Sequence, residues 1–185
     1  MLFMTRCLFI WAIVASMGLC AATAIAENKT NIVATDILTG LVPLTGLAAA
    51  YFKGDTEGQK QWLRNLCVNQ VFISGLRVAF NETSLGERPN GSEYGFPSGH
   101  VAAVMAGATF LDKRYGWKWG VPAYAASACV AYVRVDEDQH HWRDVIASGA
   151  IAYGVAMLTV TPENATHLAP IIGPDFIGLR WERSF

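Results

Sequence analysis

The pentapeptide Phe96-Pro97-Ser98-Gly99-His100 constrains the fold of this chain more than any other stretch. Pro97 lacks an N–H and clashes with a preceding turn, so it cannot lie inside a helix. The run that follows, residues 101–106, is apolar and rich in helix formers, which predicts Ser98 as the N-cap of a helix. The backbone N–H groups of Ser98, Gly99 and His100 then lie at a helix start, and such a terminus binds anions.

A second group of chemically active side chains lies downstream. His140 and Asp144 are four residues apart, so on a helix they would share a face and the carboxylate could orient the imidazole. A histidine oriented in this way serves as a nucleophile or a general base. Arg134 precedes this pair, and Arg88 and Arg77 lie upstream. Arginines, histidines and a helix start together favour phosphoryl transfer.

These residues resemble the three signature motifs of the type 2 phosphatidic acid phosphatase family, whose superfamily includes bacterial non-specific acid phosphatases and vanadium haloperoxidases. The matching segments are Arg88-Pro89, Pro97-Ser98-Gly99-His100 and Arg134-x5-His140-x3-Asp144.

Two positions depart from the family pattern. A Lys or Arg is usual seven residues before the Arg-Pro pair, where this chain has Asn81. Arg77 fills that role if residues 84–87 are an insertion in the loop. The serine usual before the third-motif arginine is Val133, which removes one hydrogen bond to phosphate.

The resemblance implies a metal-independent histidine phosphatase without a cofactor. His140 would attack phosphorus and form a phosphohistidine, Asp144 would hold its imidazole, and His100 would protonate the leaving oxygen. The phosphate-binding residues implied are Arg77, Arg88, Ser98, Gly99 and Arg134.

The resemblance implies a broad class of substrate and does not identify a single compound. A phosphorylated lipid is expected, of the phosphatidic acid, undecaprenyl pyrophosphate or lipid A type. A soluble periplasmic acid phosphatase acting on small phosphomonoesters, a vanadium-dependent haloperoxidase and a non-catalytic phosphate-binding relative remain alternatives. The net charge of −1 gives no indication of nucleic-acid binding.

The first 26 residues have the pattern of a secretory signal peptide. Arg6 precedes an apolar stretch, and Ala24-Ile25-Ala26 is a small-x-small cleavage site. A retained first membrane helix is the alternative. Residues 27–185 are then expected as a single phosphatase domain, exported to the periplasm or to the periplasmic face of the inner membrane, with an oligomeric state that the sequence does not indicate.

The predicted fold is all-α: an antiparallel bundle of about five to six helices with the phosphatase site at one end. Helices are expected at 31–52, 57–80, 98–113, 119–135 and 140–160, and the tail at 176–185 alternates loosely, like a strand. The helix at 57–80 is expected to be amphipathic. Its apolar face comprises Trp62, Leu66, Val68, Phe72, Leu76 and Phe80.

The placement of charges supports helices that cross a membrane, and the length of the uncharged runs opposes it. The uncharged runs after His100, from Trp119 and after Asp144 have about 11, 15 and 18 residues, fewer than the ~20 of a membrane span. However, Lys and Arg gather at alternate helix ends, as the positive-inside rule requires. We expect a periplasmic domain that contacts the membrane surface. Cys67 and Cys129 could be bridged or could be two buried free thiols.

Overall fold

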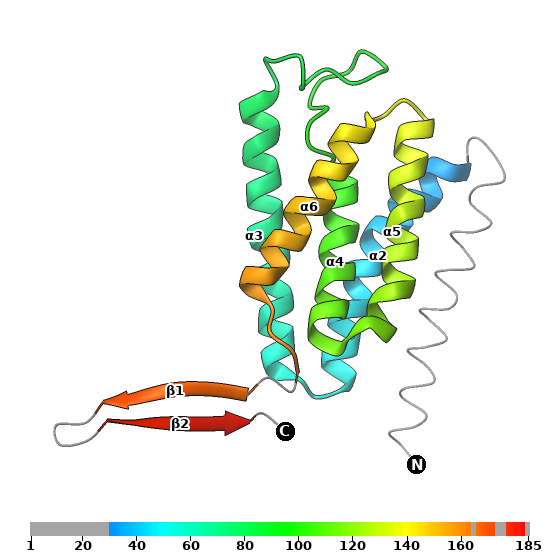
Figure 1. Cartoon of the computed structure of the whole chain (residues 1–185). Helices are drawn as coiled ribbons and strands as arrows, with labels where there is room; N and C mark the ends of the chain where they lie inside the picture. The colour runs from blue at the N-terminus through cyan, green and yellow to red at the C-terminus, as the bar shows by residue number, and fades with distance from the viewer. Residues whose placement is uncertain (1–29, 164–165, 173–176, 184–185) are drawn as a thin grey trace.

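The described part of the chain contains a bundle of five α-helices (Figure 1). The computed structural model describes residues 30–163, 166–172 and 177–183. The helices are α2 (Thr30–Phe52), α3 (Thr56–Phe80), α4 (Gly99–Tyr115), α5 (Trp117–Asp136) and α6 (Trp142–Thr159). The predicted all-α bundle is confirmed, and the helix bounds agree with the sequence except at α6, which begins after His140.

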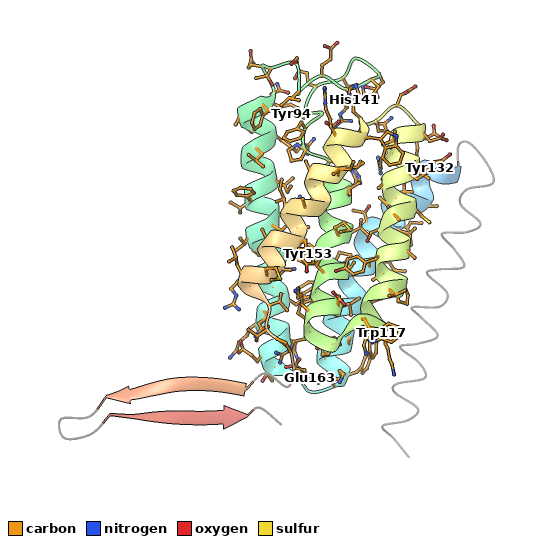
Figure 2. All side chains as sticks on the ribbon, viewed as in Figure 1. Tyr94, Trp117, Tyr132, His141, Tyr153 and Glu163 are labelled. Carbon is orange, nitrogen blue, oxygen red and sulfur yellow. The ribbon has the colours of Figure 1, made fainter. Side chains whose placement is uncertain are left out.

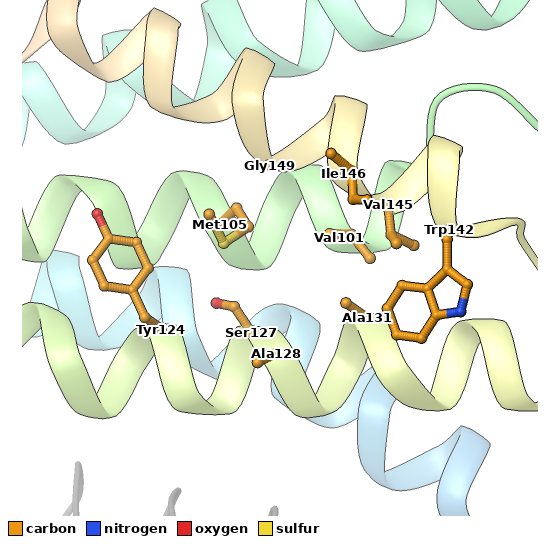
Figure 3. A pocket seen from close by; sticks show the side chains of 10 residues that line it. All are labelled: Val101, Met105, Tyr124, Ser127, Ala128, Ala131, Trp142, Val145, Ile146 and Gly149. Atoms are coloured by element: carbon orange, nitrogen blue, oxygen red, sulfur yellow. The ribbon is translucent and has the colours of Figure 1, made fainter.

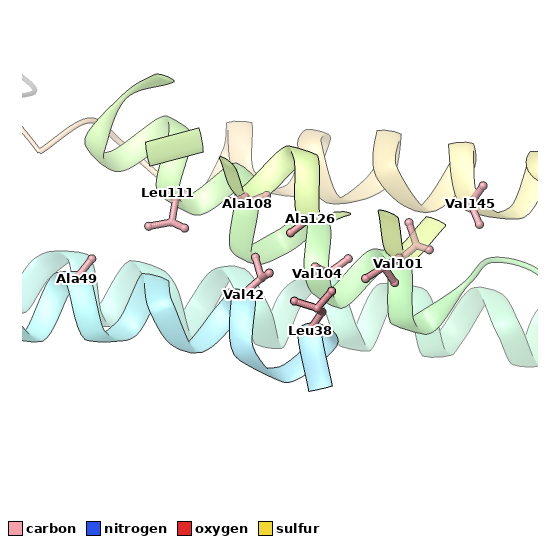
Figure 4. Close-up of a cluster of buried hydrophobic side chains, with 11 residues drawn as sticks. Leu38, Val42, Ala49, Val101, Val104, Ala108, Leu111, Ala126 and Val145 are labelled. Carbon is pink, nitrogen blue, oxygen red and sulfur yellow. The ribbon is translucent and has the colours of Figure 1, made fainter. Parts of the chain in front are cut away.

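Helix α4 lies at the centre of the bundle and packs against each of the other four. It is apolar on all sides, as expected of a buried helix. Val101, Val104, Ala108 and Leu111 of α4 meet side chains of α2, α5 and α6 in the main core cluster (Figure 4). A Cβ on Gly107 would lie 2.7 Å from the Cα of Pro43, so this glycine allows α2 and α4 to approach closely.

Helix α3 turns a polar face to the core. Its buried residues include Gln61, Asn65 and Asn69. The amide nitrogens of Asn65 and Asn69 donate to the backbone oxygens of Ala106 and Ala102 on α4, at 3.0 and 3.1 Å. Hydrogen bonding of this kind removes the penalty of burying an amide.

The apolar face of an amphipathic helix is normally buried, but part of the apolar face predicted for α3 is not. Val68 and Phe72 are 44% and 52% exposed, and Val71 is 74% exposed. Val68 and Phe72 point outward because the inner face opposite them carries amides that find partners on α4. Trp62 of the same stripe packs against the cluster around Phe110. Periodicity alone reveals that a helix has two faces but does not identify which one is buried.

The end of the bundle formed by the α2–α3 connection is held by a buried ion pair. Asp55 Oδ1 accepts a hydrogen bond from Arg114 Nη2 at 2.6 Å, and Asp55 Oδ2 accepts from Arg114 Nε and Tyr115 Oη at 2.8 and 2.9 Å. Arg114 also donates to the backbone oxygens of Thr161 and Pro162. The ends of α2, α4 and α6 are thus joined to the start of α3.

After the bundle the chain forms an antiparallel hairpin of β1 (Thr166–Ile172) and β2 (Ile177–Arg183). Strand β2 falls within the tail expected to alternate, whereas β1 was not predicted. The predicted signal peptide, residues 1–26, lies outside the described residues.

Neither described cysteine forms a disulfide. Cys67 is exposed on α3 and Cys129 on α5 is partly buried. Both thiols are free in the structure, and Cys67 is not the buried thiol that the second alternative required.

Candidate active site

The predicted motifs meet at one end of the bundle. The connection from α3 to α4 carries Arg88 and Ser98, and the connection from α5 to α6 carries His140. Figure 2 shows Tyr94 and His141 at this end, whereas Trp117 and Glu163 mark the other. The prediction of a site at one end of the bundle agrees with this placement.

One backbone hydrogen bond joins the two connections, and another closes the α3–α4 connection on itself. Asn90 N donates to Asp138 O at 3.2 Å, and Gly95 N donates to Gly86 O at 2.6 Å. A Cβ on Gly95 would lie 3.0 Å from the backbone oxygens of Gly86 and Glu87, so a side chain here would push the loop backbone apart. The α3–α4 loop is therefore a compact wall of the site.

His140 is buried and is held by the backbone of that loop. Its Nδ1 lies 2.8 Å from the backbone oxygen of Gly95 and 3.8 Å from Asp144 Oδ2. A carbonyl oxygen only accepts, so Nδ1 carries the proton and Nε2 keeps the lone pair. Burial and three nearby arginines lower the pKa of His140 to about 4 although the Gly95 bond raises it. The ring is neutral, and Nε2 can act as a nucleophile.

The structure corrects the expected geometry of His140 and Asp144. Helix α6 starts at Trp142, so His140 precedes the helix instead of sharing a helical face with Asp144. Asp144 Oδ2 accepts a hydrogen bond from the backbone N of His141 at 2.8 Å and caps α6. The Gly95 carbonyl makes the short contact to His140, and the fully buried Asp144 adds a negative charge at ion-pair distance.

Three arginines face the same space. Burial lowers the pKa of Arg88, and the positive charges of Arg77 and Arg134 lower it further. The buried Nε atoms of Arg77, Arg88 and Arg134 and the Oγ of Ser98 have no hydrogen-bond partner within the described part of the chain. Four such donors match the oxygens of a phosphoryl group.

Arg77, and not Asn81, reaches the start of α4. A Cβ on Gly99 would lie 3.3 Å from Arg77 Nη1, so the guanidinium lies against the helix N-terminus. The Oδ1 of Asn81 instead accepts a hydrogen bond from Tyr94 N at 2.9 Å. Asn81 thus holds the loop. Ser98 is the N-cap residue, as predicted, but its side chain makes no capping bond.

Sequence reasoning missed Asp36 of α2. Its Oδ1 lies 3.3 Å from His100 Nε2 and forms an ion pair with Arg134 Nη2. Burial and Arg134 lower the pKa of His100, and Asp36 acts in the opposite direction. The available signal was a lone carboxylate within the apolar run of residues 32–52.

His141 is a half-exposed neighbour of the site. Its Nδ1 is 3.5 Å from Asp144 Oδ2, and its side chain is 41% exposed. Among the residues that the structure describes, no group of three or more His, Cys, Asp or Glu side chains could hold a metal ion.

The fold and this arrangement of histidines and arginines define a phosphoryl-transfer protein. The family model of the PAP2 superfamily matches residues 7–165. The chain therefore belongs to the PAP2 superfamily, as the motifs predicted, and it is a phosphoester hydrolase.

Two curated relatives and one solved structure are similar to the chain. A lipid A 4'-phosphatase from Helicobacter pylori is 29% identical over 153 residues, which is 77% of each chain. A lipid A 1-phosphatase from Helicobacter pylori is 33% identical over 87 residues, covering 45% of this chain and 42% of the relative. The crystal structure of a transmembrane PAP2-type phosphatidylglycerolphosphate phosphatase from Bacillus subtilis superposes with a TM-score of 0.54 at 16% identity, covering 84% of this chain and 92% of that one. This last likeness establishes a shared fold.

Proposed function

We propose that this protein removes phosphate from a lipid phosphate, with lipid A as the first candidate, through a phosphohistidine at His140. The observation that carries the proposal is the convergence of Arg77, Arg88 and Arg134 on a buried, neutral His140. The similarity to two lipid A phosphatases supports a lipid as the substrate.

In the first step, Nε2 of His140 attacks phosphorus. A P–N bond forms, the P–O bond to the leaving group breaks, and His100 gives its proton to the departing oxygen. Arg77, Arg88 and Arg134 meet the charge on the equatorial oxygens with fixed donors, joined by the Ser98 hydroxyl and the N–H groups at the start of α4. Asp144 stabilises the positive charge that the imidazole acquires.

In the second step, water hydrolyses the phosphohistidine. His100, now neutral, takes a proton from the water as its oxygen bonds to phosphorus, and the P–N bond breaks. Inorganic phosphate leaves, and His140 and His100 return to their starting states. The two steps together need only His140, His100, one water molecule and the phosphate ester.

The outer surface supports a place in contact with a bilayer. Large apolar side chains are exposed on α2, α3, α5 and α6, among them Ile37, Val71, Val121 and Leu158 at 56–88% exposure. One described helix segment, Ile32–Phe52, is long and apolar enough to cross a membrane. Combined with the polar inner face of α3, this surface fits a lipid environment better than water. The proposed location is the periplasmic face of the inner membrane.

Phosphate release by the purified protein tests the proposal, with lipid A, phosphatidic acid and p-nitrophenyl phosphate as substrates in detergent micelles. We expect turnover of a lipid phosphate that persists in EDTA and is blocked by vanadate, which mimics the pentacoordinate transition state. We also expect His140→Ala to be inactive and His141→Ala to keep most of the activity. Halide oxidation gained with vanadate would instead identify a haloperoxidase, and the reverse result for the two histidines would refute the assignment of the nucleophile.

A further inference from the structure

An apolar groove of about 330 Å³ runs between α5 and α6 over α4 (Figure 3). The groove exists because the residues that line it on α5 and α6 are small, namely Ala128, Ala131 and Gly149. Met105 of α4 also lines it. The hydroxyls at its edge already have partners. Ser127 Oγ donates to Ala123 O at 2.8 Å, and Tyr124 Oη donates to Asp112 Oδ2 at 3.3 Å.

One end of the groove adjoins the phosphatase site. Figure 3 shows Trp142 at this end and Tyr124 at the other. Trp142 opens α6 two residues after His140. Ala131 precedes Arg134 by three residues on α5, and residues at that spacing are neighbours on a helix surface.

The length of the groove and its lack of free polar groups indicate which kind of molecule it can bind. From Ala131 back to Tyr124 is seven residues, so the groove is ~10 Å long at 1.5 Å per residue. A sugar or a peptide buried there would lose hydrogen bonds without replacing them, whereas a hydrocarbon chain needs none.

We propose that this groove holds an acyl chain of the substrate while its phosphate lies among the arginines. The inference rests on the lipid phosphatase function proposed above and adds the place where the lipid is recognised. A chain that comes from a bilayer or micelle is already in apolar surroundings, so the groove contributes little net burial. It acts by orienting the phosphate ester for attack by His140.

Two substitutions that fill the groove test the proposal, each with a matched control on the same helix. Ala128→Phe is paired with Ala125→Phe, because both alanines are exposed on α5 and only Ala128 lines the groove. Gly149→Leu is paired with Gly154→Leu. A Cβ on Gly149 would lie 3.6 Å from Met105 Cε, an ordinary contact, and a Cβ on Gly154 would have nothing within 4 Å.

The assay compares a long-chain phosphatidic acid in mixed micelles with p-nitrophenyl phosphate, which has no acyl chain. We expect Ala128→Phe and Gly149→Leu to lose about tenfold or more in kcat/KM for the lipid while p-nitrophenyl phosphate turnover stays within about twofold. The two controls should leave both substrates unchanged. Equal effects on both substrates, or equal effects of variants and controls, would overturn the groove proposal. Absence of lipid turnover by the wild-type protein would overturn the proposed function instead.

A second measurement needs no variant. A phosphatidic acid analogue with a photoactivatable diazirine in its acyl chain is cross-linked to the wild-type protein, and the labelled peptides are identified by mass spectrometry. Labelling within residues 124–131 and 142–149, suppressed by unlabelled substrate, is expected. Labelling spread over the exposed faces of α2 and α3 would refute the assignment.

Discussion

Arg77 and Asn81 lie one helical turn apart at the end of α3, and their side chains have different partners. Arg77 lies against Gly99 at the start of α4, and its Nη2 is 3.4 Å from the backbone oxygen of Tyr94. Asn81 binds the backbone N of Tyr94. A charged donor beside a transferring phosphoryl group contributes far more to catalysis than a neutral amide that holds a loop.

We therefore predict that Arg77→Ala lowers kcat/KM by about 10²-fold or more with the fold intact, because the transition state loses one cation. Asn81→Ala should lose less than about tenfold, since only the loop is loosened. Steady-state kinetics and circular dichroism measure both effects. Near-wild-type kinetics for Arg77→Ala would refute the interpretation of residues 84–87 as an insertion.

Asp36 gives a prediction with two readouts. Its carboxylate raises the pKa of His100 and pairs with Arg134. In Asp36→Asn the pKa of His100 falls, so the proton needed by the leaving group is lost at lower pH and the alkaline limb of the pH–rate profile moves to lower pH. Arg134 is also released, so inhibition by inorganic phosphate should strengthen by about tenfold.

Asp36→Glu keeps the charge and is the matched control. It should retain most of the wild-type pH profile. A parallel loss of activity at every pH in Asp36→Asn, without a shift of the limb, would indicate a purely structural residue.

The motifs predicted which residues would come together, because each motif has a fixed spacing. Arg88, Ser98, His100, Arg134, His140 and Asp144 lie at the same end of the bundle. The carbonyl that holds His140 was not predictable, since any residue at position 95 carries one. Asp36 was also missed, because it is far from the motifs in sequence and joins them only when α2 packs beside α5.

At the scale of elements, α3 has three buried amides on its inner face and several large apolar side chains on its outer face. Gln61, Asn65 and Asn69 are buried, and Leu63, Val71 and Val78 are 56%, 74% and 69% exposed. In water such a helix would turn over to bury its apolar face. In lipid the arrangement is the stable one, because amides find partners inside and alkyl groups face acyl chains.

Val71→Lys tests the surroundings of α3. Val71 is near the middle of the helix, where a lysine in lipid costs about 3 kcal/mol. We expect this variant to show a lower unfolding midpoint in lipid nanodiscs and a smaller membrane fraction after alkaline carbonate extraction. Ser92→Lys, in an exposed loop, should change stability by less than about 0.5 kcal/mol. Equal, small effects of both substitutions would show that the face of α3 meets water.

The helices themselves were predictable because their apolar runs are long and are bounded by Gly, Pro and charged residues. The pairing of β1 with β2 was not predictable from the sequence. The register of a strand depends on its partner segment, and the sequence of β1 contains Pro170, which is unusual in a strand. The start of α6 was also misplaced. Asp144 caps the helix through His141 N, which a run of polar residues does not reveal.

At the scale of the whole molecule, the two ends of the bundle differ in whether their buried arginines have hydrogen-bond partners. The site end carries arginine nitrogens without partners within the described residues, whereas the far end satisfies its buried arginine completely. Arg114 and Asp55 have side chains 4% and 9% exposed. Removing one partner of a buried pair leaves an uncompensated charge, which is strongly destabilising. The far end should therefore govern stability without affecting catalysis.

The pH dependence of unfolding tests this division. Burial alone would raise the pKa of Asp55, but hydrogen bonds from Arg114, Gly58 and Tyr115 outweigh it and hold the pKa below its ordinary value. A carboxylate with a depressed pKa stabilises the fold above its unfolded pKa of about 4, and this contribution is lost as the pH falls through the folded value. Asp55→Asn should thus lower the unfolding free energy by about 3 kcal/mol at neutral pH, and by less in acid.

The matched control is Glu163→Gln at the same end. Glu163 pairs with Lys53 at 2.9 Å, but the two side chains are 31% and 19% exposed, so this pair contributes less than about 1 kcal/mol. Chemical unfolding at several pH values, followed by circular dichroism, separates the two variants. Because Asp55 and His140 lie at opposite ends of the bundle, the folded fraction of each variant should keep the wild-type kcat/KM. A pH-independent stability difference between Asp55→Asn and the wild type would show that the Asp55 carboxylate does not titrate with folding.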